Sequence, residues 1–146
     1  MVLKAYTAEQ IRRAERPHLE AGAPLMAIAA HGLVTAAARL LEERLGGVAG
    51  ARILLLVGAG NNGGDALYAG AELSSRGAAI TAVLTASRCH AEGLEALRRS
   101  GGSVLDLEED GAQACRDAAL GCALIVDGIL GTGGSGGLRE PAAGLV

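Results

Sequence analysis

The stretch "LLLVGAGNNGGDALYAG", residues 54–70, decides the fold. Its apolar start belongs to a strand predicted over Arg52–Val57, because short continuous apolar runs are typical of strands buried on both faces of a parallel sheet. Gly58, Gly60 and Gly63 follow with the G-x-G-x-x-G spacing, which lets a backbone turn approach a phosphate at a helix N-terminus. The stretch therefore predicts a strand–turn–helix unit with a ligand site at the turn.

The chain after this unit repeats the pattern of a strand followed by a helix. Strands are predicted over 80–84, 103–105 and 123–126, and helices over about 65–76, 91–99 and 112–120. Such alternation indicates an α/β domain with a doubly wound, mostly parallel sheet. Right-handed crossovers give the strand order 3-2-1-4, which places the first and fourth strands side by side.

Two helices are predicted before the first strand. Thr7 and Gln10 have the spacing of a capping box, and Pro17 is expected to limit or kink the helix that follows. Pro24 suits the first turn of a second, alanine-rich helix, which Gly46-Gly47 ends. This second helix fits either a core position or a dimer face.

Composition limits the class of protein. The 146 residues fit one domain, half of them are apolar, and the core must be aliphatic because the chain has two tyrosines and no Phe or Trp. The net charge of −3, without a Lys/Arg run, argues against a nucleic-acid partner. We expect Cys89, Cys115 and Cys122 to be free thiols. The sequence shows no signal peptide and no apolar run of the ~20 residues that span a membrane, so we expect a cytoplasmic protein.

The two glycine-rich loops are expected to face one crevice. One follows the first strand, and the other begins at Asp127 after the fourth strand and runs through "GILGTGGSGG", residues 128–137. Ligands of doubly wound folds bind outside the carboxyl ends of the strands, where the strand order reverses. Both loops lie at that point of the predicted sheet.

The chemistry of the first loop leaves several interpretations open. A nucleoside-triphosphate P-loop is excluded because Gly64 and Asp65 stand where Lys and Ser/Thr would be needed. A dehydrogenase-type turn lacks its acidic ribose partner after the second strand, although Arg88 could meet a 2′-phosphate. Asn61, Asn62 and Asp65 could also simply shape and cap the turn, as Asp127 could shape the second loop.

A third interpretation takes these polar groups as ligands of a cation. Amide, carboxylate and backbone oxygens suit hard cations, and rings of backbone carbonyls can replace the hydration shell of potassium. A site shared by the two loops requires Asn62 and Asp127 to point toward the same side of the molecule.

Taken together, these motifs resemble the NAD(P)H-hydrate epimerase family, also called the YjeF N-terminal domain family. The family's "GxGNNGGDG" is similar to "GAGNNGGDA" at residues 58–66, and its "VDxxxGTG" is similar to "VDGILGTG" at 126–133. "YTAEQIRRAE" (6–15) and "PLMAIAA" (24–30) also resemble the family's leading helices. The resemblance covers the whole chain and implies a Rossmann-like three-layer α/β/α sandwich.

The resemblance also implies a substrate, an ion and partners. Family members interconvert the R and S forms of hydrated NADH and NADPH, often as homodimers, and some carry a fused C-terminal ADP/ATP-dependent NAD(P)H-hydrate dehydratase. Potassium would be held by Asn62 and Asp127. The implied substrate contacts are Asn61, Asn62, Gly63, Gly64, Asp65, Gly131, Thr132, Gly133, Gly134, Ser135, Gly136 and Gly137.

Two departures from the family pattern accompany the resemblance. Ala66 replaces the last glycine of the first motif. The family continues with a further strand and a "VDxPSG"-like motif, so residues 1–146 are expected to be a domain truncated at its C-terminus.

The predicted activity is epimerisation, with Asp65 or Asp127 taking part in the proton transfers. The alternatives are a non-catalytic nucleotide-binding or scaffold module on the same fold and an NADP-dependent oxidoreductase. The three histidines show no triad or zinc spacing, and the run 108–110 is expected to be a solvated loop.

Overall fold

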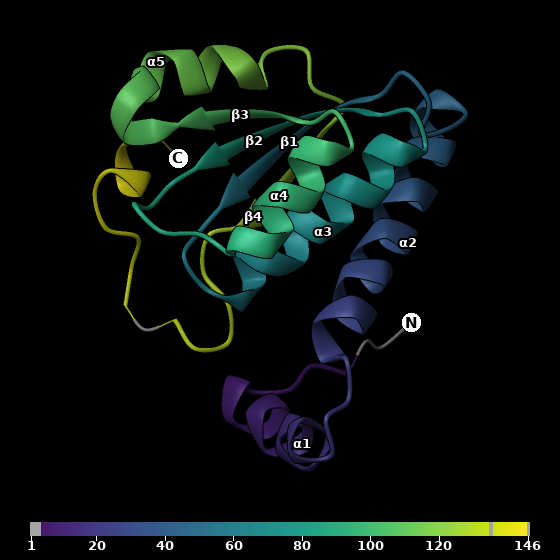
Figure 1. Ribbon diagram of the computed structural model, residues 1–146, viewed down its shortest axis with the longest axis vertical. Coiled ribbons are helices and arrows are strands. Elements are labelled where there is room, and N and C mark those ends of the chain that lie inside the picture. The colour runs from purple at the N-terminus through teal and green to yellow at the C-terminus, as the bar shows by residue number, and fades with distance from the viewer. Residues whose placement is uncertain (1–3, 135, 146) are drawn as a thin grey trace.

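The computed structural model describes residues 4–134 and 136–145, which form an α/β fold built on a four-stranded parallel sheet (Figure 1). The strand order is β3-β2-β1-β4, so the order predicted from right-handed crossovers is confirmed. The strands are β1 (Arg52–Val57), β2 (Ala79–Leu84), β3 (Ser103–Asp106) and β4 (Leu124–Gly128).

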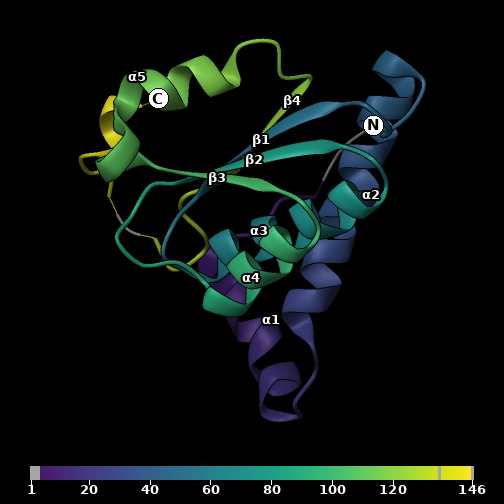
Figure 2. The same cartoon turned by 45° about the horizontal axis from the view of Figure 1, so that its top comes forward.

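Helices cover both faces of this sheet, which confirms the three-layer α/β/α sandwich with N-terminal helices. Figure 2 shows α3 (Asn61–Ser75) and α4 (Ala91–Arg99) on one side of the strands and α5 (Leu107–Ala119) on the other. The long helix α2 (Leu25–Leu45) packs against α3, and α1 (Ala8–Glu20) lies beyond it, away from the strands. A short 3-10 helix, Ala142–Gly144, closes the described part of the chain beside α5.

The alternation of β1 side chains divides the core into two layers. Successive residues of a strand point to opposite faces. Leu55 and Val57 pack with α2, α3 and α4, whereas Leu54 and Leu56 pack with α5. Five of the six β1 residues are buried, as expected for a central strand of a parallel sheet.

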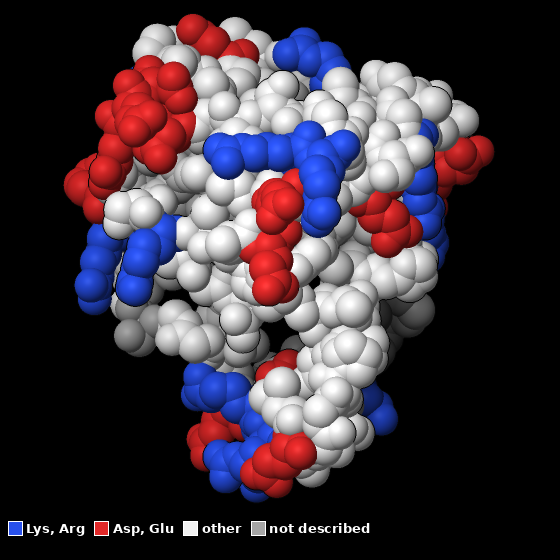
Figure 3. Space-filling model, in the orientation of Figure 1, with Lys and Arg blue, Asp and Glu red and all other residues white. Residues whose placement is uncertain are grey.

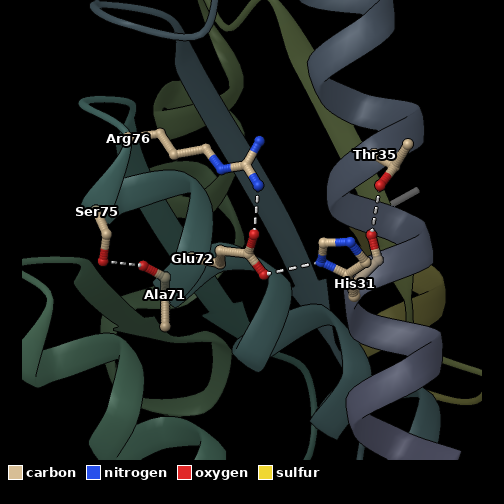
Figure 4. Close-up of polar contacts among 6 residues, drawn as sticks. All are labelled: His31, Thr35, Ala71, Glu72, Ser75 and Arg76. Carbon is tan, nitrogen blue, oxygen red and sulfur yellow. Dashed lines mark hydrogen bonds and ion pairs between the residues drawn. The ribbon is translucent and has the colours of Figure 1, made fainter.

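Helix α2 joins the core through one stripe of small and aliphatic residues, namely Ala30, Val34, Ala37 and Leu41. Alanines in this stripe let the backbones of α2 and α3 approach closely. At the solvent edge of the contact, Figure 4 shows Glu72 between Arg76, the C-cap of α3, and His31 of α2, with His31 Nδ1 3.6 Å from Glu72 Oε2. These groups are partly exposed, so burial of the apolar stripe contributes more than the ion pairs.

The sequence was expected to contain no apolar run long enough to span a membrane, and α2 does not meet that expectation. By length and composition alone this 21-residue helix is long and apolar enough to cross one. In this fold it packs its apolar stripe on α3, as helices at the edge of a soluble core also do.

Several predicted element ends are confirmed. Thr7 accepts from the Gln10 N–H and Gln10 Oε1 accepts from the Thr7 N–H, so the capping box is present. Gly46 ends α2 in the left-handed conformation, where glycine is favoured because it has no Cβ. Pro17 lies inside α1, which continues to Glu20, so the expectation that it would limit the helix is wrong.

Two helices begin earlier than predicted. α3 starts at Asn61 rather than near Asp65, because the extended residue Gly60 serves as the N-cap without a side chain. α5 begins at Leu107, where the Asp106 carboxylate accepts from the N–H groups of Glu108 and Glu109. The positive φ of Gly111 (82°) interrupts it, so the helix predicted from about residue 112 corresponds to its second segment. The acidic run 108–110 is therefore the first turn of a helix rather than a loop, and its charges favour that helix end.

The α2–α3 contact predicts different costs for two adjacent leucines of α2. Leu41 is 1% exposed and Leu40 is 44% exposed. Leu41→Ala leaves a cavity and should lower the free energy of unfolding by about 2–5 kcal/mol. Leu40→Ala is the matched control and should change it by less than about 1 kcal/mol. Urea unfolding followed by circular dichroism measures both, and equal losses would contradict the packing described for α2.

Candidate functional site

The two glycine-rich loops meet at the carboxyl ends of β1 and β4, as the strand order predicted. The Gly58 N–H donates to the Gly128 carbonyl at 3.1 Å, and Asn62 Nδ2 donates to the Leu130 carbonyl at 2.9 Å. The second bond joins residues 68 positions apart in the chain. Asn62 therefore ties the first motif to the second.

Glycine is required where the two loops touch. A Cβ at Gly58 would lie 2.0 Å from the Ile129 carbonyl oxygen, and one at Gly63 would lie 2.2 Å from the Gly58 oxygen. Both obstacles are backbone atoms, which cannot rotate away. By contrast, a Cβ at Gly60 would meet no heavy atom within 4 Å. The first and third glycines of the G-x-G-x-x-G pattern are thus explained by packing.

A cavity of about 1210 Å³ opens at this junction. Its walls are the two loops, residues 85–87 after β2, the segment 137–142, and parts of α1 and α2. Figure 3 shows the molecule hollowed between the lobe that contains α1 and the main body. The predicted site residues that line it are Asn61, Asn62, Asp65, Gly131, Thr132, Gly133, Gly134 and Gly137.

Other predicted site residues lie elsewhere. Gly63 and Gly64 are buried in the first turns of α3, the former against Gly58 and the latter against the His90 ring. Gly136 is exposed and is not part of the cavity wall, and Ser135 lies outside the described residues. Arg88 is exposed, one position beyond the wall residue Ser87.

The N-terminus of α3 points its free backbone donors at this junction. Because Gly60 is the N-cap, the N–H groups of residues 60–63 have no partner within the helix. Such an end attracts anions through its N–H groups and its dipole. Asp65 lies in the second turn and does not cap the helix, so its interpretation as a capping residue is wrong. Ala66, which replaces the last glycine of the family motif, follows Asp65 inside the helix and is buried. An alanine fits this helical position.

Asp65 is held in an unusual electrostatic environment. Its Oδ1 atom is buried and has no hydrogen-bond partner among the described residues. Burial, together with the negative charge of Glu15, raises the pKa of Asp65, while His90 opposes the rise. A carboxyl group with a raised pKa exchanges its proton nearer neutral pH than an ordinary aspartate does, which suits acid–base chemistry.

Several charged wall residues were not found by sequence reasoning. Arg12 and Glu15 come from α1, and Arg139 and Glu140 come from the segment after the second glycine loop. Arg12 and Glu15 are three residues apart and Arg139 and Glu140 are adjacent, and neither spacing matches a known motif. Only the fold places these residues at the cavity. With Asp65 and Glu108, the wall holds four carboxylates and two guanidinium groups, so it favours a positive charge in the cavity.

Of the two predicted potassium ligands, Asn62 lines the cavity and Asp127 does not. In β4, Asp127 pairs with Leu56, and Leu56 packs on the α5 side of the sheet, so Asp127 belongs to the face opposite α3. Its side chain is exposed, accepts from the Ile129 N–H at 3.0 Å and is absent from the cavity wall, so here it shapes the loop.

Asn62 fits an oxygen ligand, since its amide nitrogen is already bonded to Leu130 and its side-chain oxygen is the remaining polar atom. Asp127 is not on the cavity wall beside it, and the potassium site shared by the two residues stays a prediction. No group of three or more His, Cys, Asp or Glu side chains able to hold a metal occurs within residues 4–134 and 136–145. A potassium ion here would depend on Asn62 and backbone carbonyls.

The cysteines take no part in the site. All three are free, as expected, and Cys115 is buried on the inner side of α5. Burial raises the pKa of the Cys89 and Cys115 thiols, which keeps both in the unreactive thiol form.

The sheet order, the paired glycine loops and the cavity between them define a doubly wound α/β domain with its ligand site at the switch point of the sheet. Residues 22–146 match the family described as YjeF-related protein N-terminus, and the chain belongs to that family.

Curated relatives carry related names. The chain is 41% identical over 133 residues to the NAD(P)H-hydrate epimerase of Clavibacter michiganensis, a match that covers 91% of this chain and 55% of that protein. It is 43% identical over 141 residues to the bifunctional NAD(P)H-hydrate repair enzyme of Mycobacterium tuberculosis, covering 94% of this chain and 28% of that protein. The chain thus spans about half or less of the length of these relatives.

A solved structure has the same fold. The crystal structure of yeast ynu0, YNL200c, superposes with a TM-score of 0.79 at 22% sequence identity. The match covers 99% of this chain and 63% of that one, and it supports the architecture described above.

The contact between the loops predicts different outcomes for two neighbouring glycines. Gly58→Ala forces a Cβ into the Ile129 backbone and should lower the free energy of unfolding by about 1–3 kcal/mol or more, the usual cost of overpacking. Gly60→Ala is the matched control, with open space and an ordinary φ of −92°, and should change stability by about 1 kcal/mol at most. Thermal unfolding followed by circular dichroism compares them; a tolerated Gly58→Ala would contradict the loop contact.

The environment of Asp65 predicts a pH-dependent effect of Asp65→Asn. The unfolded chain loses this proton near the ordinary value of 3.8, whereas the folded protein retains it to higher pH. The stability that the proton provides is therefore present below that value and is lost as the pH rises through the folded pKa. Asp65→Asn has no titrating group at this buried position, so it should be more stable than the wild type at pH 7 and lose this advantage near pH 3.

Urea unfolding at the two pH values measures the difference between variant and wild type. The exposed Asp117→Asn in α5 is the control and should show no comparable pH-dependent gain. A gain for Asp65→Asn at pH 3 but not at pH 7 would show that the sign is reversed.

Proposed function

We propose that this chain catalyses the interconversion of the R and S forms of hydrated NADH and NADPH. Family membership and the names of the relatives support this substrate. The observation that carries the proposal is the convergence of the two motif loops, joined by the bond between Asn62 and the Leu130 carbonyl, on a cavity that also contains Asp65.

The reaction requires loss and return of one hydroxyl group. The carbon that is inverted bears a hydroxyl and the ring nitrogen, so departure of the hydroxyl as water leaves a nitrogen-stabilised cation. Protonated Asp65 donates a proton to the departing oxygen, and the resulting carboxylate takes a proton from the water that adds to either face. Atoms and charge balance over the cycle, and Asp65 ends protonated as it began.

The charges of the cavity wall suit that intermediate. Four carboxylates against two guanidinium groups stabilise a cation relative to the neutral hydrated ring. The free N–H groups at the start of α3 provide an anion site for a phosphate of the same substrate. The two ends of a hydrated nicotinamide nucleotide thus match different parts of the wall.

The substrate contacts implied by the family resemblance remain part of this proposal. Residues Asn61, Asn62 and Asp65 would act through side chains, and the loop 131–137 would act through its backbone. Potassium would be held by Asn62 and backbone carbonyls, and no chemical step is assigned to it. Asp127 has no role in this mechanism.

Partners and location also belong to the proposal. A homodimer would use exposed apolar side chains of α2 outside its buried stripe, such as Ile28 and Leu40. The name of the bifunctional mycobacterial relative supports a functional link with a dehydratase that acts on the same substrate. The proposed compartment is the cytoplasm, where nicotinamide cofactors are used.

Asp65→Asn should lower epimerisation of hydrated NADPH by about 10²–10⁴-fold, the usual contribution of a general acid–base group. Chromatography of the R and S forms after mixing either form with the protein measures the rate. Because the same variant is expected to be stable at pH 7, the loss would not reflect unfolding. Asp117→Asn should retain wild-type activity.

Other outcomes would identify a different class of protein. A wild-type protein that binds the hydrate without changing the R/S ratio would be a non-catalytic module. A change in reduced-nicotinamide absorbance with an added substrate would indicate an oxidoreductase. Full activity of Asp65→Asn would remove Asp65 from the mechanism.

A further inference from the structure

Helix α1 buries little apolar surface against the rest of the protein. None of its residues, all within the described part of the chain, is buried, and only Ile11 and Glu15 are partly buried. Figures 1 and 2 show it beyond the strand ends, joined to the body through the start of α2. Because buried apolar area is the main stabilising term, a helix that buries so little needs polar contacts to hold its position.

Arg12 makes such a contact. Its Nη1 atom donates to the carbonyl oxygen of Thr132, 120 positions away in the second glycine loop. The loop residue it reaches is part of the cavity wall, and so is Arg12 itself. This bond fixes the loop and the helix relative to one another, and a guanidinium has further N–H groups left for a ligand.

The inward face of α1 is polar where a core helix would be apolar. Arg12, Glu15 and Leu19 occur at helical spacing, and all three line the cavity. Glu15 is half-buried and lies close enough to Asp65 for the two negative charges to oppose each other. An apolar residue at position 15 would avoid this repulsion. A carboxylate there is explained if the space between the two is occupied by a ligand that carries positive charge or hydrogen-bond donors.

We propose that α1 is a wall of the substrate site and that Arg12 is a positioning residue, which holds the second glycine loop in its binding conformation. This inference rests on the proposed function for the identity of the ligand. Binding in the cavity and docking of α1 are then coupled: the ligand stabilises the docked helix, and the docked helix strengthens binding by the same factor.

The test compares Arg12→Ala with Arg13→Ala, a matched change on the same helix. Arg13 is exposed and is not part of the cavity wall. In the protein without substrate, hydrogen exchange should become faster in α1 and in residues 130–134 for Arg12→Ala and stay unchanged for Arg13→Ala. Circular dichroism should show the wild-type helix and sheet content for both variants, because α1 contributes so little to the core.

Kinetics with hydrated NADPH distinguish a positioning role from a merely structural one, because only a positioning role changes KM without a similar change in kcat. Arg12→Ala should raise KM by about 10–100-fold, the usual effect of losing a charged hydrogen bond, and change kcat much less. Arg12→Lys should recover part of this loss, because an ammonium group can still donate to the Thr132 carbonyl. Hydrated NADPH should also slow exchange in α1 of the wild type.

The outcomes separate this inference from the proposed function. If Arg12→Ala matches Arg13→Ala in both exchange and KM, the role of α1 is overturned although the epimerase proposal stands. If no variant and no wild-type protein epimerises the hydrate, the proposed function fails. In that case faster exchange of residues 130–134 in Arg12→Ala alone still supports the positioning role of Arg12.

Discussion

The site depends on how closely the backbone after β1 approaches the backbone after β4. No side chain can stand between Gly58 and the Ile129 carbonyl, because even a Cβ would lie 2.0 Å from that oxygen. The contact sets the distance between the loops, and the Asn62 side chain then bridges them to Leu130. The free N–H groups at the start of α3 lie directly after this contact and face the same cavity.

Asp65 shows what this arrangement costs the fold. A carboxyl group with one oxygen buried and unpartnered among the described residues destabilises the folded state relative to a neutral residue. Natural proteins keep such unfavourable groups where activity needs them, and the raised pKa is the chemical property that the proposed proton transfer uses. The same reasoning applies to Glu15, whose negative charge repels that of Asp65 and helps to raise its pKa.

The sequence predicted the sheet well because its signals are local. β1 is one apolar run bounded by glycine, and strand order follows from the handedness of crossovers. It missed the start of α3, since Gly60 caps without a side chain, and the start of α5, where an acidic run resembles a loop. The face of the sheet on which Asp127 lies depends on the register of β4, because a shift of one residue moves every side chain of a strand to the other face. The place of Arg12 depends on a contact across 120 residues, which no local pattern encodes.

The aliphatic core has an optical consequence. Without tryptophan or phenylalanine, the protein has only Tyr6 and Tyr68 as near-ultraviolet chromophores, so it absorbs and emits weakly there. A nicotinamide or its hydrate would dominate the spectrum even when the protein is in excess. Titration of an absorbing ligand is therefore little obscured by the signal of the protein itself.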